Sequence, residues 1–340
     1  MARLMESESE TMDHSANSMS FIITTGADAG YFPLVQELIA SIRDALPDAQ
    51  VPVGVLDGGL LSEQCSWLAA RGVSIATPPR LAHTAKAVRK RPALAVNLGK
   101  LWLDSCFPGH ETILWLDADT WVQDRAAIDE LLGAARQGAL AIVPGSGRCW
   151  ERQVDMRWWL GGLGQLRSFN FKNARHARLP LSVCRDLGTR ALLNAGAFAL
   201  RSDAPHWDVM RRWQAYILRH GKPFTSDQLA MALTTYIDGH KLELLPDWCN
   251  YITPCRVDPV RGELLEFYYP YRKIGIVHMS AKNAMRKDAD ATIPVLGTDG
   301  RTYQLNLRYG IMQRMIRQYS AAPMPPDGAC DMVDAERLMP

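Results

Sequence analysis

The sequence of 340 residues is long enough for one large α/β domain or two small ones, at roughly 150 residues per domain. Its composition, 47% hydrophobic and 22% charged, excludes wholesale disorder, a collagen-like repeat and a coiled coil. No apolar run reaches the roughly 20 residues that a membrane span requires. A net charge of +2 argues against a general nucleic-acid-binding protein.

The cysteines and the two ends of the chain favour a cytoplasmic location. Seven cysteines are scattered without a CxxC motif, which argues against a disulfide framework and against a thiolate zinc site. The first 20 residues carry four acids and no apolar core, so they do not resemble a secretory signal. We expect residues 1–19 and 320–340 to be disordered tails, and residues 20–319 to form a single domain.

The first 76 residues alternate between strand and helix patterns. The predicted strands are Phe21–Thr25, Val51–Leu56 and Val73–Ala76, and the predicted helices are Phe32–Ala45 and Ser62–Ala70. This order predicts an α/β fold, with a Rossmann-like, mostly parallel sheet and helices on both of its faces.

A central strand and a less regular region follow. Ile113–Leu116 is apolar on both faces, as expected of a strand buried between two helix layers. Residues 146–190 lose periodicity, and we interpret them as an inserted, partly helical, basic active-site flap. The other expected elements are a helical segment at Ala93–Cys106, a strand at Ala191–Leu200 broken by Asn194-Ala195-Gly196, helices at Ala204–Arg219 and from Ser226, a strand at Ile274–Val277 and a closing helix at Thr302–Tyr319.

Two aspartates follow the central strand in the segment TILWLDADTWVQD (112–124). Asp117 and Asp119, two positions apart, project from the same side of an extended chain. At the carboxyl end of a central parallel strand they would open into the crevice in which α/β folds bind ligands. Adjacent carboxylates repel each other unless a cation neutralises them. Oxygen ligands suit Mg²⁺ or Mn²⁺, which commonly bridge to phosphates, so the motif predicts a metal–diphosphate site.

The segment LWLDADTWV resembles the DxD strand of nucleotide-sugar glycosyltransferases with the GT-A fold. The pattern from about residue 21 to 282 is most similar to the retaining group that contains glycogenin and the bacterial lipopolysaccharide galactosyltransferases. This resemblance implies transfer of a hexose from a nucleotide sugar, a UDP-sugar, with Mn²⁺ or Mg²⁺ as cofactor, in the synthesis of a cell-surface polysaccharide. It also implies that Asp117, Asp119 and His278, which ends a late strand, hold the metal.

The same resemblance assigns roles to further residues. Those implied to contact the nucleoside or the diphosphate are Thr25, Asp28, Tyr31, Asp57, Lys100 and Lys282. Those implied to contact the donor sugar and the acceptor are Asn194, Asp227 and Gln228. In a retaining enzyme Gln228 or Asp227 lies behind the anomeric carbon, whereas in an inverting enzyme Asp227 would be the general base. The chain departs from the group after His278, where Ala281 and Lys282 stand at +3 and +4, so Lys282, Arg286 and Lys287 are alternatives for phosphate contact.

Each of these residues also has an ordinary structural explanation. Asp227 can stabilise the N-terminus of a helix, and Asn194 can shape a break in a strand. Tyr31 and Asp57 can cap or pack, Lys100 can be a solvated charge on a helix, and His278 can be a core or loop histidine.

Basic residues in the flap indicate an anionic partner. Between Ser146 and Arg190 nine lysines and arginines stand against three acids, a net charge of +6. We expect these bases to meet a glycan or lipid-linked acceptor, or an anionic membrane surface at the inner face of the membrane, at about 1 kcal/mol per base. The bases concerned are Arg148, Arg152, Arg157, Arg167 and Lys172, with the cluster Lys86–Arg91. A solvated insertion explains the same charges, and Trp158 and Trp159 either pack in the core or stack on a sugar.

Two other functions fit the motif. The sequence DADT also satisfies DxDxT, the nucleophile motif of haloacid-dehalogenase-type phosphatases, although two β-α units precede it here. A non-catalytic nucleotide-sugar-binding module is the third hypothesis. A separation of more than about 8 Å between His278 and both aspartates would exclude a shared cation, because metal–ligand bonds are only about 2 Å long.

Overall fold

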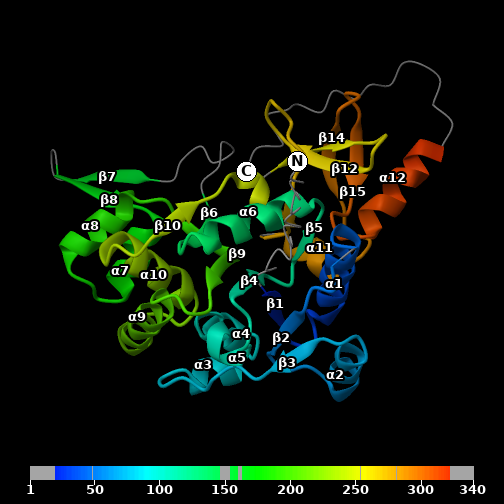
Figure 1. Ribbon diagram of the computed structural model, residues 1–340. Helices are drawn as coiled ribbons and strands as arrows, with labels where there is room; N and C mark the ends of the chain where they lie inside the picture. Colours follow the sequence, from blue (N-terminus) through cyan, green and yellow to red (C-terminus); the bar gives the residue numbers. More distant parts are fainter. Residues whose placement is uncertain are drawn as a thin grey trace, which may run out of the picture.

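The computed structural model describes residues 20–47, 49–145, 154–159, 163–252, 254–280 and 282–321. A seven-stranded sheet runs through it in the order β10-β6-β9-β4-β1-β2-β3 (Figure 1). Its strands are β1 (Phe21–Ala27), β2 (Val53–Asp57), β3 (Ser74–Ala76), β4 (Thr112–Leu116), β6 (Leu140–Pro144), β9 (Leu193–Arg201) and β10 (Leu242–Leu244). All neighbours pair in parallel except β9, which is antiparallel to both β4 and β6. The predicted α/β fold with a mostly parallel sheet is confirmed.

Helices cover both faces of this sheet, because side chains of each central strand point alternately to the two sides. On one face Ile23, Leu114 and Leu116 pack against α1 (Phe32–Ala45) and α6 (Arg125–Arg136). On the other face Ile22, Ile113 and Trp115 join a second apolar cluster. Helices on that second side are α4 (Leu94–Gly99), α5 (Leu103–Cys106), α7 (Phe169–His176), α8 (Leu181–Thr189), α9 (His206–His220) and α10 (Ser226–Ala232). Helix α2 (Ser62–Ala69) lies beside β3, and α3 (Ala85–Lys90) lies beside α4.

A separate four-stranded sheet, absent from the sequence prediction, lies beside the main sheet with α12 (Ile311–Ala321) (Figure 1). Its strands are β11 (Cys255–Asp258), β12 (Glu263–Glu266), β14 (Ile293–Gly297) and β15 (Thr302–Leu305), in the order β12-β11-β14-β15. The prediction of one helix over Thr302–Tyr319 is wrong at its start. Tyr303 and Leu305 are buried while Thr302 and Gln304 are exposed, which is the two-residue period of a strand.

Two short strand pairs connect the main sheet to its surroundings. Strand β5 (Thr120–Val122) pairs antiparallel with β13 (Ile276–His278), and β7 (Asp155–Trp159) pairs with β8 (Leu163–Arg167). The short helix α11 (Asn283–Lys287) follows β13. Two 3-10 turns span Lys100–Trp102 and Asp247–Cys249, and a π-helical turn spans Leu233–Ile237.

Strand β9 also differs from its prediction. It runs without a break from Leu193 through Asn194 and Gly196, and the irregularity is instead a register shift against β6, between Ile142 and Val143. Within the predicted flap, Arg148 and Arg152 lie outside the described residues, as do the side chains of Arg157, Trp158, Trp159 and Arg167. Among the described helices, none has the length and apolar character needed to cross a bilayer.

Candidate functional site

A cleft of about 960 Å³ opens at the carboxyl ends of β1 and β4, beside the start of β9. Its lining brings together nine of the twelve residues that the sequence singled out: Asp28, Tyr31, Lys100, Asp117, Asp119, Asn194, Asp227, Gln228 and His278. Thr25, Asp57 and Lys282 are not among its lining residues. Of the three alternative bases that follow His278, the structure therefore places Arg286 and Lys287 at the cleft, and Lys282 outside its lining.

Asp117 is held in a tight turn at the end of β4. Its backbone N–H donates to Gly196 O at 2.7 Å, and its carbonyl accepts from the Thr120 hydroxyl at 2.7 Å. Its carboxylate accepts from Trp115 Nε1 at 2.8 Å and contacts Lys100 Nζ at 2.7 Å, both through Oδ1. The strand before it is buried throughout. The side chain is thus fixed at the floor of the cleft by its own strand and by a helix residue.

Asp119 and His278 face each other across the β5–β13 pair. Pairing of His278 with Thr120 sets the register, and the Met279 N–H donates to Asp119 O at 2.9 Å. His278 Nε2 lies 3.4 Å from Asp119 Oδ1. The separation of these groups is therefore far below the 8 Å limit that would exclude a shared cation.

Asn250, which the sequence analysis did not single out, orients the imidazole. Its Oδ1 lies 2.9 Å from His278 Nδ1, and an amide oxygen can only accept, so Nδ1 carries a proton. The other ring nitrogen, Nε2, then faces the Asp119 carboxylate. A ring nitrogen and a carboxylate oxygen at this distance need a proton or a metal ion between them, and an oriented imidazole of this kind is typical of metal ligands.

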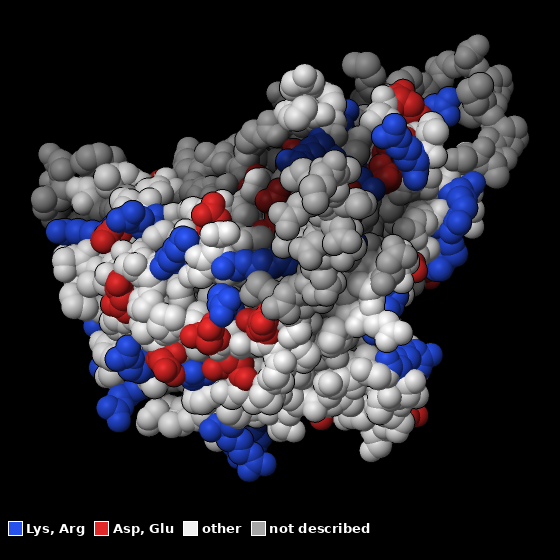
Figure 2. Space-filling model, viewed as in Figure 1, with Lys and Arg blue, Asp and Glu red and all other residues white. Residues whose placement is uncertain are grey.

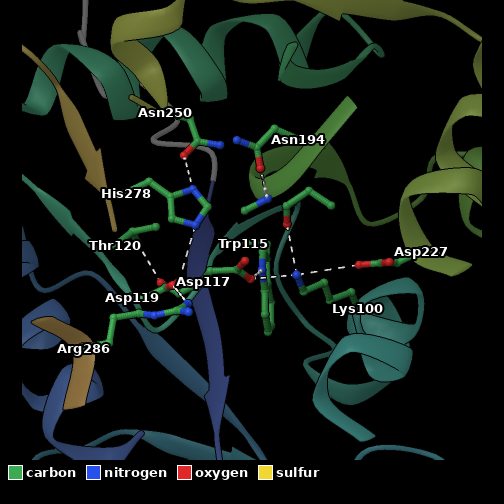
Figure 3. Close-up of polar contacts among 12 residues, drawn as sticks. Lys100, Trp115, Asp117, Asp119, Thr120, Asn194, Asp227, Asn250, His278 and Arg286 are labelled. Carbon is green, nitrogen blue, oxygen red and sulfur yellow. Dashed lines mark hydrogen bonds and ion pairs between the residues drawn. The ribbon is translucent and has the colours of Figure 1, made fainter. Parts of the chain in front are cut away.

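Asp117, Asp119 and His278 offer three ligand atoms that lie within 4.8 Å of one another (Figure 3). Two carboxylate oxygens and one imidazole nitrogen are a donor set that fits Mg²⁺ or Mn²⁺. Arg286 contacts the second carboxylate oxygen of Asp119, Nη1 to Oδ2 at 2.5 Å. Although burial alone would raise it, His278 and Arg286 hold the pKa of Asp119 well below its usual range. The carboxylate is therefore ionised and ready to bind a cation.

Lys100 occupies the centre of a buried ionic group rather than a solvated helix surface. Besides Asp117, its ammonium contacts Asp227 Oδ2 at 3.7 Å and donates to Ala195 O at 3.2 Å (Figure 3). Burial by itself would lower the pKa of Lys100, but the two carboxylates raise it above the usual value. Burial raises the pKa of Asp227 above its usual value, and Lys100, at 3.7 Å, offsets only part of this effect.

Strand β9 and the start of α10 line another part of the cleft. Asn194 Oδ1 accepts the Gly196 N–H at 3.1 Å, and Gly196 lies against the His278 ring. A Cβ added at Gly196 would lie 2.2 Å from His278 Cε1, so only glycine fits here. Thr225, which precedes α10, has a φ of 76°, a strained conformation for a β-branched residue. This backbone presents Asp227 in the first turn of the helix.

At the end of the cleft formed by β1 and β2, several polar side chains shape loops. Asp28 Oδ1 accepts from the backbone N–H groups of Gly30 and Tyr31. Asp57 Oδ1 accepts from Gly59 and Leu60 in the same way. Thr25 is buried, and its hydroxyl has no partner among the described residues. In this structure Asp57 thus has the capping role that the sequence analysis kept as an alternative, and Asp28 caps its loop in the same way, a role the sequence analysis did not consider.

Comparisons with known proteins give likenesses in structure only. No family model and no curated protein matches the sequence. The chain is similar to the solved structure of galactosyltransferase LgtC in complex with donor and acceptor sugar analogs, at 14% identity and a TM-score of 0.48, covering 88% of this chain and 97% of that one. It is also similar to the apo bifunctional glycosyltransferase WbbM, at 14% identity and 0.49, covering 78% and 46%. Mouse xyloside xylosyltransferase 1 matches at 11% identity and 0.45, covering 77% and 98%. A functional assignment has to come from the geometry of the site.

Proposed function

We propose that the protein is a metal-dependent glycosyltransferase, which moves a sugar from a UDP-sugar or a related nucleotide sugar to a glycan or lipid-linked acceptor. The observation that carries the proposal is the convergence of Asp117, Asp119 and His278 at the carboxyl end of a central strand. The cleft around them is in the size range of pockets that enclose a ligand of this kind. Mg²⁺ or Mn²⁺ is the proposed cofactor.

A divalent cation bound there would supply Lewis acidity to the leaving diphosphate. The chain's own residues would do the rest. Arg286 and Lys287 line the cleft as positive charges that can offset the charge developing on the diphosphate. Lys100 fixes Asp117 in place. Asp227 and Gln228, on the first turn of α10, are the candidates for contact with the reacting sugar, and retention of configuration is the proposed stereochemistry.

The acceptor would enter between the α3–α4 segment and the loop before α10. Arg91 and Phe224 line the cleft there, with the guanidinium 4.9 Å above the ring, and the ring is half exposed. Arg190 also lines the cleft. An aromatic face suits a sugar, and two arginines suit an anionic group on it. Lys and Arg also gather at the lower edge in Figure 2, where α3 lies, which supports an anionic acceptor or peripheral contact with an anionic membrane.

The test uses Asp119→Asn, which keeps the shape of the side chain and removes its charge. Turnover, measured as release of UDP from UDP-sugars in the presence of Mn²⁺, should fall about 10³-fold, since metal stabilisation is worth several kcal/mol and each 1.36 kcal/mol is tenfold. The matched control is Asp129→Asn, an exposed aspartate paired with Arg125 on α6, which should leave turnover unchanged. Wild-type turnover by Asp119→Asn, or turnover indifferent to chelation of metal, would contradict the proposal. If the protein released phosphate from an aryl phosphate and no UDP from UDP-sugars, the alternative function as a DxDxT-type phosphatase would be favoured.

A further inference from the structure

Arg286 occupies an unusual position for a base at a metal site. It lies on α11, 167 positions along the chain from Asp119, and reaches that carboxylate at 2.5 Å. The two oxygens of Asp119 are thereby divided: Oδ1 faces His278 and Oδ2 faces the guanidinium (Figure 3). The guanidinium carbon also lies 5.8 Å from the centre of the Tyr31 ring, on the cleft wall. A single arginine therefore contacts both a metal ligand and the end of the cleft formed by β1.

The charges at the floor of the cleft nearly cancel. Lys100 contacts Asp117 and Asp227, and Arg286 contacts Asp119, so two cations stand against three carboxylates. These five side chains leave one negative charge for a divalent cation to meet. Removing one of the two cations would double that charge, and at short range in a buried site such a change strongly affects the binding of an ion.

We propose that Arg286 is an exchangeable counter-ion: it competes with the divalent cation for Asp119 and pairs with the diphosphate of the donor once the cation has bound. The inference rests on the proposed function, because it takes the metal and the diphosphate as ligands of this cleft. A guanidinium suits both partners, since its planar fork matches carboxylate and phosphate oxygens alike. The position of Arg286 in the cleft lining lets it serve either one.

The exchange makes metal and nucleotide binding interdependent. The cation alone has to displace a favourable ion pair, so its affinity is held down. The diphosphate brings a new partner for the displaced guanidinium, so its binding raises the affinity for the cation. By linkage, the cation raises the affinity for the diphosphate by the same factor.

The test is calorimetric titration of Mn²⁺, alone and with saturating UDP, and of UDP with saturating Mn²⁺. In Arg286→Met we expect Mn²⁺ alone to bind about tenfold more tightly, and UDP with Mn²⁺ about tenfold more weakly, within the usual range of coupling between sites. Arg286→Gln keeps a hydrogen-bond donor without the charge, and its Mn²⁺ and UDP affinities should change in the same directions as in Arg286→Met. Arg286→Lys keeps the charge and should retain the coupling. The matched control is Arg125→Met, which removes a guanidinium from an exposed Arg–Asp pair and should change neither affinity.

The outcomes separate this inference from the proposed function. If the wild-type protein binds neither Mn²⁺ nor UDP, the proposed function fails and the inference fails with it. If the wild type binds both, but both neutral variants bind Mn²⁺ alone equally or more weakly, Arg286 only orients Asp119 and the exchange is refuted. Tighter Mn²⁺ binding with an unchanged UDP affinity would equally refute it, because the guanidinium would then not reach the diphosphate.

Discussion

The floor of the cleft and helix α3 both contain several charged residues, but those at the floor are buried and paired, whereas those on α3 are exposed. At the floor, the side chains of Lys100, Asp227 and Asp119 are 4%, 7% and 8% exposed, and each lies in an ion pair. On α3, Lys86, Arg89 and Lys90 are exposed, and in the described part of the chain no carboxylate lies within ion-pair distance of them. Buried charges need compensation within the fold, whereas exposed ones remain available to a partner.

This difference distinguishes structural charges from charges that bind a ligand. The charged residues at the floor already form ion pairs with one another, so a ligand that binds there has to replace some of these pairs. The bases on α3 have no such ion pairs in the described part of the chain, so an anion can bind them without breaking one. The effects of substitutions at the cleft floor and on α3 should therefore differ in size. They should also differ in which property changes, stability or ligand binding.

The largest effect is expected at the floor. Lys100→Met should lower the free energy of unfolding by about 3 kcal/mol, because it leaves the buried Asp227 and the partly buried Asp117 without their cation. Urea unfolding measures this. Adding Asp227→Asn to the same chain should restore part of the loss, since one of those carboxylates is then neutral. The matched control is Lys273→Met, which breaks partly exposed pairs with Glu263 and Asp124 and should cost less than about 1 kcal/mol, because both pairs are open to solvent and Lys100 is not. If Lys100→Met and Lys273→Met lowered the free energy of unfolding equally, the distinction between buried charges at the floor and exposed charges would be contradicted.

The second effect concerns the position of His278 rather than a charge. Gly196→Ala would place a Cβ 2.2 Å from His278 Cε1 and 2.7 Å from its Nδ1, which faces Asn250. The imidazole has to shift, so Mn²⁺ affinity should fall about 10- to 100-fold, the usual result of disturbing the surroundings of a ligand. Titration of Mn²⁺ in the presence of UDP measures it.

The matched control for that substitution is Gly133→Ala in the middle of α6. No atom lies within 4 Å of its added Cβ. It should stabilise the helix by up to about 1 kcal/mol and leave Mn²⁺ binding as it is. Unchanged Mn²⁺ binding in Gly196→Ala would show that the imidazole is not held where the metal needs it.

The smallest effect is expected on α3. Arg89→Gln should leave the free energy of unfolding within about 0.5 kcal/mol of the wild-type value. It should weaken binding to vesicles that contain phosphatidylglycerol about fivefold, since each base is worth about 1 kcal/mol at an anionic surface. The control Arg301→Gln lies at the end of the molecule opposite α3, between β14 and β15 (Figure 1). Co-sedimentation that does not depend on the phosphatidylglycerol content would contradict the membrane contact.

Local patterns were sufficient to predict the main sheet. The strand before Asp117 is apolar on both faces, and the alternation of strands and helices up to Ala76 matches β1 to β3 closely. The four-stranded sheet was missed because its strands are short and only half buried. In Thr302–Leu305 the two-residue alternation was present in the sequence, and Gly310, with a φ of 75°, marks the real break before α12.

The site was predictable only in part, because its decisive contacts join distant segments. The spacing of Asp117 and Asp119 indicated a cation site, and resemblance suggested His278. Nothing local indicates that Asn250 orients the imidazole, since that contact depends on how the loop after Asp247–Cys249 packs beside β13. The partners of Lys100 likewise come from three separate elements. A helix lysine of this kind is normally solvated, and only the packed fold shows that this one is not.

The β5–β13 pair also determines when the site can form during synthesis. It pairs Thr120 with His278, 158 positions further along the chain, and Arg286 and Asp119 are 167 positions apart. Domains are made from the N-terminus, and contacts between distant segments form late in folding. The ribosome therefore releases Asp117 and Asp119 long before His278 exists to complete the ligand set. A nascent chain that stops before β13 can build much of the main sheet, but it lacks one of the three residues of the proposed metal site.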